Sequence, residues 1–270
     1  ILNQTIPTMI AGLGMMFVVA MGATDISAGV VVALSSYFAC IAVEAIGSWV
    51  VIPASIIVGI ITGLFIGIVN TKFKVPSFMI TLSLVISLRA LVTLLLGPQT
   101  LQIAKPLRDL FNGWPMRLGV LIGLILIIVY IFNYTPFGWY AKAIGENENA
   151  VKFSGINVNK VKIAAFMISG VMAAIAGVFT ATRVGGVSTT LGASFEMKIM
   201  MGIFIGGIPV SGGMNTKVSK LLIGCLMITM LESGLVLMNV SGAITQGVRG
   251  VVLLVAVYFA RVMSERFSNA

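Results

Sequence analysis

The sequence predicts an all-α protein, a polytopic bundle of transmembrane helices. Hydrophobic residues make up 59% of its 270 residues, and charged residues only 9%. A water-soluble domain carries about 25% charged residues, because its surface has to be hydrated. The apolar residues also fall in continuous runs, such as 118–132, and not in the alternating pattern of a transmembrane β-strand. Lipid is therefore the expected solvent for much of the chain.

Nine apolar segments follow one another along the chain, and each is a candidate crossing of about 20 residues. The seventh is short for a straight crossing, at roughly 14 residues. Glycines and prolines stand at or near many segment ends, and no linker divides the chain. We therefore expect one transmembrane domain, residues 1–270. The segments are 6–23, 30–46, 50–69, 78–96, 118–134, 163–182, 197–210, 221–238 and 243–260.

The basic residues indicate the orientation, because Lys and Arg gather in cytoplasmic loops. If the C-terminus is cytoplasmic, ten of the 17 basic residues lie on that side. Nine crossings then leave Ile1 outside, and the chain does not begin with Met. We expect one more helix ahead of residue 1, ten in all, and a cytoplasmic N-terminus. The ten basic residues are Lys72, Lys74, Lys142, Lys152, Lys160, Lys162, Lys217, Lys220, Arg261 and Arg266.

The residue types exclude most catalytic chemistry. The chain has no histidine, which removes the commonest general base and the commonest metal ligand. Cys40 and Cys225 lie inside apolar runs, so we expect core residues and neither a disulfide nor a metal site. The glycine-rich stretches lack the G-x-x-x-x-G-K-[ST] motif of a nucleotide site. We expect no catalytic residue, metal or cofactor, and the net charge of +9 indicates loop charge rather than nucleic-acid binding.

The longest polar insert, residues 135–162, is expected to contain a short capped helix on the cytoplasmic face. Gly145 precedes this helix and Gly155 closes it, as glycine often does after a last turn. Acids in the first turn and a base in the last complement the helix dipole. Such a helix suits docking to a partner, and an ordinary connecting loop is the alternative. The charged residues are Glu146, Glu148 and Lys152, and the apolar side has Ala150, Val151 and Phe153.

Several polar residues fall within or beside apolar segments, where a charge costs about 2.5–3.5 kcal/mol and needs a partner. Two interpretations stay open. In the structural one, Asp25 caps a helix start and Arg89 pairs with an acid. In the functional one, these residues line a polar permeation path. The candidates are Asp25, Ser27, Arg89, Glu196 and Glu232.

Residues 138–162 resemble the cytoplasmic loop of ribose-type (monosaccharide) ABC transporter permeases. Two further blocks, 1–34 and 194–213, resemble other regions of that family in the same order and spacing. The sequence departs from the family pattern at 23–24, Ala28, 197–201 and 208–209, outside the loop, which bears on the substrate. The loop matches at Gly138, Ala143, Gly145, Asn147, Ala150, Ser154, Gly155, Ile156, Val158 and Lys162.

The resemblance implies a permease subunit of a binding-protein-dependent importer in the bacterial cytoplasmic (inner) membrane. Its partners would be a separate ABC ATPase, a periplasmic or lipid-anchored sugar-binding protein, a second permease chain and membrane lipid, with no nucleic acid. The expected cargo is a ribose-like or related monosaccharide. An ion-coupled secondary transporter is the alternative, which would favour discontinuous helices and internal repeats. The residues implied in coupling to the ATPase are Gly145, Glu146, Asn147, Ala150, Ser154 and Gly155.

Overall fold

The computed structural model describes residues 1–268, with the side chains of 1–242 and 244–259, and its elements are mainly helices. Two short strands, β1 and β2, pair in antiparallel fashion. In chain order the elements are α1 (Leu2–Ala20), α2 (Ala28–Ile46), the 3-10 turn η1 (Ser48–Val50), α3 (Val51–Lys72), α4 (Ser77–Leu96), β1 (Leu101–Gln102), α5 (Lys105–Asn112), α6 (Trp114–Tyr134), α7 (Pro136–Phe153), α8 (Val158–Val184), β2 (Gly186–Val187), α9 (Phe195–Ile205), α10 (Val218–Leu237) and α11 (Gly242–Ser268).

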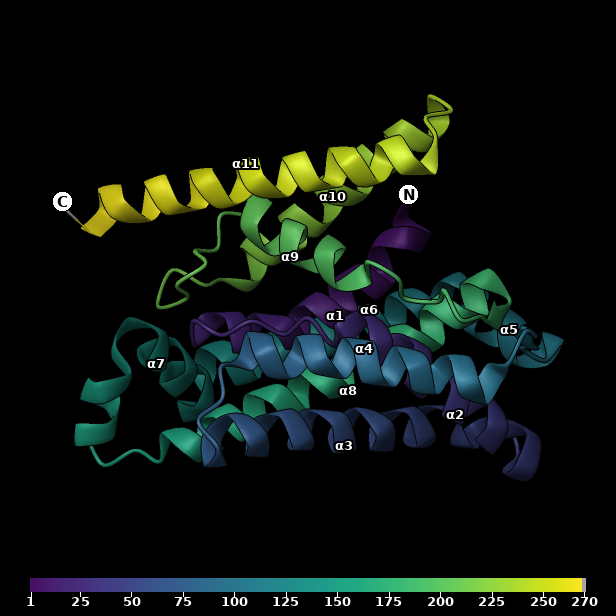
Figure 1. Ribbon diagram of the computed structural model, residues 1–270, viewed down its shortest axis with the longest axis horizontal. Helices are drawn as coiled ribbons and strands as arrows, with labels where there is room; N and C mark the ends of the chain where they lie inside the picture. Colours follow the sequence, from purple (N-terminus) through teal and green to yellow (C-terminus); the bar gives the residue numbers. More distant parts are fainter. Residues whose placement is uncertain (269–270) are drawn as a thin grey trace.

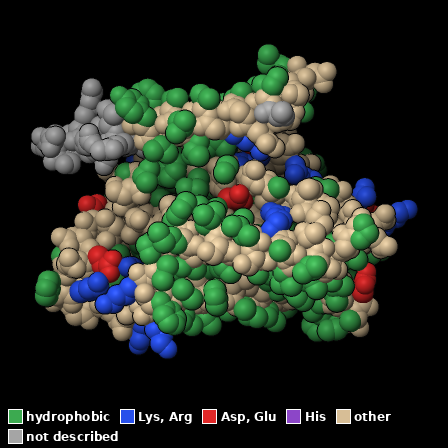
Figure 2. All heavy atoms as spheres, in the orientation of Figure 1, with side chains coloured by type: hydrophobic (Ala, Val, Ile, Leu, Met, Phe, Trp, Pro, Cys, Tyr) green, Lys and Arg blue, Asp and Glu red, His purple; other side chains and the backbone are tan. Residues whose placement is uncertain are grey.

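The long helices run along the long axis of the molecule (Figure 1). Helix α7 lies at one end and α5 at the other, which we call the α7 end and the α5 end. Helix α11 forms the outermost layer on one side and finishes at the α7 end. Hydrophobic side chains cover much of the face in Figure 2, whereas charged side chains gather at the two ends and in a central hollow. This distribution fits a bundle whose helices cross a bilayer along their length.

Helix α8 lies at the centre of the bundle and packs against α1, α2 and α3. Helices α1 and α8 are largely buried, while α4 and α6 bury only a small share of their residues. Since lipid is as apolar as leucine, exposed leucines on α4 and α6 need no protein cover. The chain therefore buries α1 and α8 in the middle and presents α4 and α6 outward.

Three glycines on α3 allow its backbone to touch α8. Gly59, Gly63 and Gly67 follow one another at intervals of four, the small-residue spacing of close transmembrane helix pairs. A Cβ atom on Gly63 would lie 2.3 Å from the Phe166 carbonyl oxygen, and one on Gly59 would lie 2.4 Å from that of Gly170. No side chain fits at these contacts, so the α3–α8 pair depends on glycine.

Two helices begin inside the bundle instead of at its ends. Ser27 is the N-cap residue of α2, and the turn before it contacts α8 through Asp25 and Ser169, part-way along α8. Helix α9 has 11 residues and begins after Ser194, whose φ of 58° is left-handed. A Cβ on Gly192 would lie 2.1 Å from the Gly29 carbonyl oxygen, so the starts of α2 and α9 cross in backbone contact.

The structure confirms an all-α polytopic bundle, but it does not confirm nine crossings of a ten-helix protein. Seven helices are long and apolar enough to span a membrane among the residues described. Helix α9 is too short, because its predicted segment 197–210 continues past the helix end at Ile205 into a turn with Gly207 at φ 82°. In α11, the residues with described side chains include an apolar stretch, Ile244–Phe259, which is not among the seven. The seven are α1, α2, η1 with α3, α4, α6, α8 and α10.

Replacing Gly63 by alanine should lower the free energy of unfolding by about 2 kcal/mol, because the new methyl group forces the α3 and α8 backbones apart. Thermal unfolding of the purified protein in detergent measures the change. Gly123→Ala on α6 is the matched control, since a Cβ there meets nothing within 4 Å. That variant should be as stable as wild type or slightly more stable. Equal melting of Gly63→Ala and Gly123→Ala would contradict the packing argument.

Candidate functional site

The predicted short helix exists as the second half of α7. Helix α7 kinks at Asn147, whose φ of −158° and ψ of 98° are not helical. The Asn147 side-chain oxygen accepts the backbone N–H of Ala150 at 3.0 Å, which caps the second half. Gly155, at φ 79°, closes it and donates its N–H to the Lys152 carbonyl at 3.1 Å. The helix thus ends as predicted but starts at Asn147, because Glu146 still belongs to the first half.

Gly145 and Glu146 attach α7 to two other parts of the chain. A Cβ on Gly145 would lie 2.1 Å from the Ala20 carbonyl oxygen, so α7 touches the end of α1. The same Ala20 carbonyl accepts the N–H of Gly213 at 2.9 Å. Glu146 accepts the N–H of Met214 at 2.8 Å. Helix α7, the end of α1 and the link between α9 and α10 therefore form one hydrogen-bonded unit.

Glu148 attaches the second half of α7 to α8. Its carboxylate pairs with Lys152 at 2.7 Å and with Lys162 at 2.8 Å. Burial raises the pKa of Glu148, but the hydrogen bonds and charges of the two lysines outweigh burial and hold the pKa below its ordinary value. Glu148 is therefore ionised at neutral pH and keeps both lysines in place.

The outward side of this unit is an exposed surface, which we call the α7 surface. Phe153 is 92% exposed, an unusual state for a phenylalanine at the water-facing end of a bundle. Trp139 and Met214 are about half exposed and line a shallow apolar depression together with Ala150, which belongs to the same short helix as Phe153. An apolar patch next to charged residues is typical of a site that binds another protein. The α7 surface comprises Trp139, Asn147, Ala150, Phe153, Ser154 and Met214.

A second polar group lies deep in the bundle, around Asp25, which is 2% exposed. One carboxylate oxygen accepts the backbone N–H of Ser27 at 2.9 Å and its hydroxyl at 2.6 Å. The other accepts the hydroxyl of Ser169 on α8 at 2.7 Å. Asp25 therefore holds the start of α2 against α8, which supports the structural interpretation of this residue. Ser169 was not predicted, because a lone serine in an apolar segment gives no signal of its partner.

The other predicted polar residues surround the starts of α2 and α9 or lie on α10. Arg89 donates to the carbonyl oxygens of Thr189 at 3.1 Å and Leu191 at 2.7 Å, where pairing with an acid was expected. Glu196 is buried in the first turn of α9, against Gly29. Its carboxyl group lies at the positive end of that helix. The arrangement brings Asp25, Ser27 and Glu196 to one place, with Arg89 at the turn before α9.

Glu232 lies apart from this group, on α10. Among the acidic residues in the described membrane segments, it is the one that pairs with two basic residues. It pairs with Lys198 of α9 and Arg249 of α11, both at 2.7 Å. Sequence reasoning missed both partners, because they come from different helices and no spacing relates them. The described residues contain no group of three or more His, Cys, Asp or Glu residues that would hold a metal ion.

Comparison with known proteins gives consistent matches along the chain. The model of the family described as branched-chain amino acid transport system / permease component matches residues 1–257. The chain is 33% identical to the ribose import permease protein RbsC of Haemophilus influenzae, over 95% of this chain and 82% of the relative. It is 31% identical to RbsC of Escherichia coli K12, over 95% and 83%. The galactofuranose transporter permease protein YtfT of E. coli K12 is 28% identical, over 99% and 79%. No solved structure matches the chain.

Replacing Asp25 by alanine should destabilise the protein by about 3 kcal/mol or more, because buried donors of Ser27 and Ser169 lose their acceptor. Asp25→Asn should cost less, since one oxygen remains to accept. Chemical unfolding in detergent measures both. Ser83→Ala is the control, because that exposed hydroxyl only bonds its own helix at Met79. If Asp25→Ala unfolded like wild type, the network would not hold α2 in place.

Proposed function

The chain belongs to the family of branched-chain amino acid transport system permease components, and from that premise we propose that it is the membrane-spanning permease subunit of an ABC importer for a monosaccharide. The observation that carries the proposal is the match along the chain to permeases named for ribose and galactofuranose. In this proposal the chain catalyses no reaction and binds no cofactor. ATP hydrolysis takes place on a separate subunit.

The α7 surface is the proposed docking site for the ATPase. It presents a kinked, capped helix whose base is attached to α1, α8 and the α9–α10 link, so force applied to it is not lost in a flexible loop. The exposed Phe153 suits insertion into an apolar pocket of the partner, since aromatic residues dominate binding energy at such interfaces. Six residues either form this surface or hold its base in place: Gly145, Glu146, Asn147, Ala150, Ser154 and Gly155.

A displacement of α7 would be transmitted to the membrane interior through two chain segments that contact it. Ala20, which contacts Gly145, is followed within a few residues by Asp25 and the start of α2. Gly213 and Met214, which contact Ala20 and Glu146, lie in the link that follows α9. The two helices that begin inside the bundle are therefore the ones attached to α7. We infer that they move when the ATPase closes, and that this changes access to the path.

The proposed orientation puts the α7 end and the C-terminus in the cytoplasm and the α5 end outside, in a bacterial inner membrane. Helix α11 finishes at the α7 end, in agreement with the side expected from the basic residues (Figure 1). A sugar-binding protein would then deliver its cargo at the α5 end. A second permease chain, identical or related, would complete the path.

Phe153→Ala should reduce co-purification of the ATPase with the tagged permease at least about tenfold, because truncating an aromatic anchor costs roughly 2 kcal/mol or more at an interface. The assay is the ratio of ATPase to permease after affinity purification from membranes. Folding should be unaffected, since the side chain is 92% exposed.

Trp49→Ala is the matched control, because Trp49 is also an exposed aromatic residue, at 73%, but lies just before α3 at the opposite end. It should leave co-purification unchanged. Equal retention by both variants would place the docking site elsewhere. A wild-type permease that binds no ATPase would contradict the ABC assignment and favour an ion-coupled transporter.

A further inference from the structure

A cavity of about 380 Å³ lies between α1, the end of α8, α9, α10 and α11. Cavities of this size hold small-molecule ligands. Its lining includes charged side chains from four different helices, at positions where the neighbouring residues are apolar. Charges in membrane segments face protein or water, because exposure to hydrocarbon is costly. Because charged side chains line this cavity, lipid tails are not its expected occupant.

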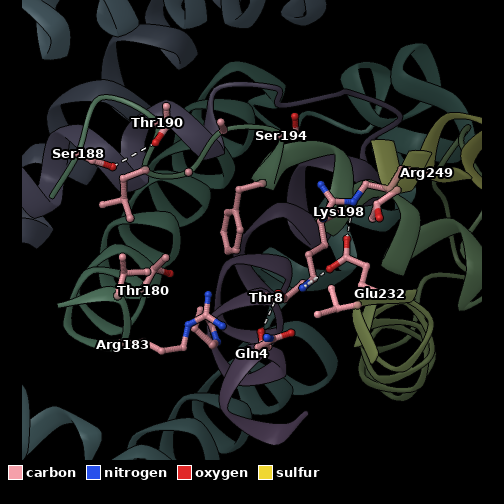
Figure 3. A pocket seen from close by; sticks show the side chains of 18 residues that line it. Gln4, Thr8, Thr180, Arg183, Ser188, Thr190, Ser194, Lys198, Glu232 and Arg249 are labelled. Atoms are coloured by element: carbon pink, nitrogen blue, oxygen red, sulfur yellow. Dashed lines mark hydrogen bonds and ion pairs between the residues drawn. The ribbon is translucent and has the colours of Figure 1, made fainter. Parts of the chain in front are cut away.

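The charges in this cavity do not balance. Arg183, Lys198 and Arg249 line it together with one carboxylate, Glu232, so three positive charges and one negative charge leave two positive charges. Glu232 forms ion pairs with Lys198 and Arg249, at 2.7 Å each, although its Oε1 and the Arg249 Nε are buried without a hydrogen bond. Figure 3 shows Arg183 reaching into the cavity from the opposite wall. Arg183 is an exposed residue, and among the residues described its guanidinium forms no hydrogen bond or ion pair.

The start of α9 adds to the positive potential. Gly192, Ala193 and Ser194, which immediately precede this helix, also line the cavity. Ser194 is the N-cap residue, and its side chain makes no capping bond. A helix N-terminus favours an anion at its open end. Glu196 offsets part of this charge, but it lies against Gly29 and does not line the cavity.

The remaining polar lining consists mostly of hydroxyl groups. They come from four segments of the chain (Figure 3), and a site for a polyhydroxylated molecule requires several such groups. The residues are Thr8, Thr180, Ser188, Thr190, Ser194 and Thr245, with the amide of Gln4.

The cavity also lies toward the α5 end. Its residues on α1 are in the first turns of a helix that runs toward α7, and those on α8 are in the last turns of a helix that starts beside α7. In the proposed orientation this is the side at which cargo arrives.

We propose that this cavity is an entry subsite for a cargo that carries an oxyanion, a carboxylate or a phosphate ester on a sugar-like polyol. Arg183 makes the charge-assisted contact with the anion, the open end of α9 supports it, and the hydroxyl groups bind the polyol. The Glu232 carboxylate keeps Lys198 and Arg249 in position. This inference rests on the proposed import function and narrows the cargo from monosaccharides in general to acidic ones.

The test is ligand protection against thermal unfolding, with the full-length permease in phosphatidylcholine nanodiscs. Two matched pairs serve as probes: D-galacturonate with D-galactose, and glucose 6-phosphate with glucose. At least one acid should protect at a concentration about tenfold or more below that of its neutral partner, the factor expected of one charge-assisted contact. High salt should weaken this preference.

Arg183→Gln should abolish the preference for the acid while leaving the unliganded melting temperature near that of wild type. Arg108→Gln is the control, since Arg108 is an exposed arginine of α5 outside the cavity lining, and it should keep the preference. Equal protection by acid and neutral sugar in wild type would overturn the proposal. So would a preference that survives in Arg183→Gln.

Two further results distinguish this inference from a lipid-binding site and from a failure of the proposed import function. If wild type shows no acid preference and Arg183→Gln loses co-purified phosphatidylglycerol, the occupant is a lipid headgroup and the proposal fails. ATPase co-purification does not involve the cargo. A permease that retains its ATPase but prefers no acid therefore overturns only the cargo inference, whereas loss of ATPase binding in wild type contradicts the import function itself.

Discussion

The requirement that every backbone polar group in hydrocarbon finds a partner inside the protein shapes the whole structure. Continuous helices satisfy it without help, so they form the lipid-facing layers. Within the described part of the chain, the helices are interrupted in a few places inside the bundle, and each interruption needs an added partner. Asp25 accepts the Ser27 N–H at 2.9 Å, and Arg89 donates to the Thr189 and Leu191 carbonyls ahead of α9. The buried charges at the centre thus make irregular backbone possible inside a membrane.

This constraint explains why the interruptions lie next to each other. The starts of α2 and α9 are in contact at Gly29 and Gly192, so one set of polar residues supports both. Helix α9 packs on α10 and α11, whereas α2 packs on α3 and α8, so their contact joins two halves of the bundle. A junction made of backbone contacts and hydrogen bonds can shift without exposing new apolar surface. We regard it as the mechanical link between the α7 surface and the cavity at the α5 end.

The sequence alone predicts those features that depend on local composition. Continuous apolar runs predict the helices, and Gly155 predicts the end of α7, because both signals lie within a few residues. The start of α7's second half is not predictable in this way, since Glu146 stays in the first half through its bond to Met214, 68 residues away. Asp25 is a similar case: the sequence predicted that this residue is important, but not that its partner is Ser169 on α8. The glycine face of α3 (Gly59, Gly63 and Gly67) was not predicted, and no local signal identifies α8 as the helix that it meets.

The charged residues of the cavity come from different helices, so the sequence did not predict their pairing, and they bear on which cargo the protein selects. Lys198 is one of the positions at which the sequence departs from the permeases that it resembles, and its pairing with Glu232 draws α9 toward α10. A lysine that served only to neutralise Glu232 would be redundant, because Arg249 pairs with the same carboxylate. Two basic partners for one acid leave a positive charge that the described protein groups do not balance. This excess of positive charge agrees with the proposal that an anionic group binds in the cavity and supplies the missing negative charge.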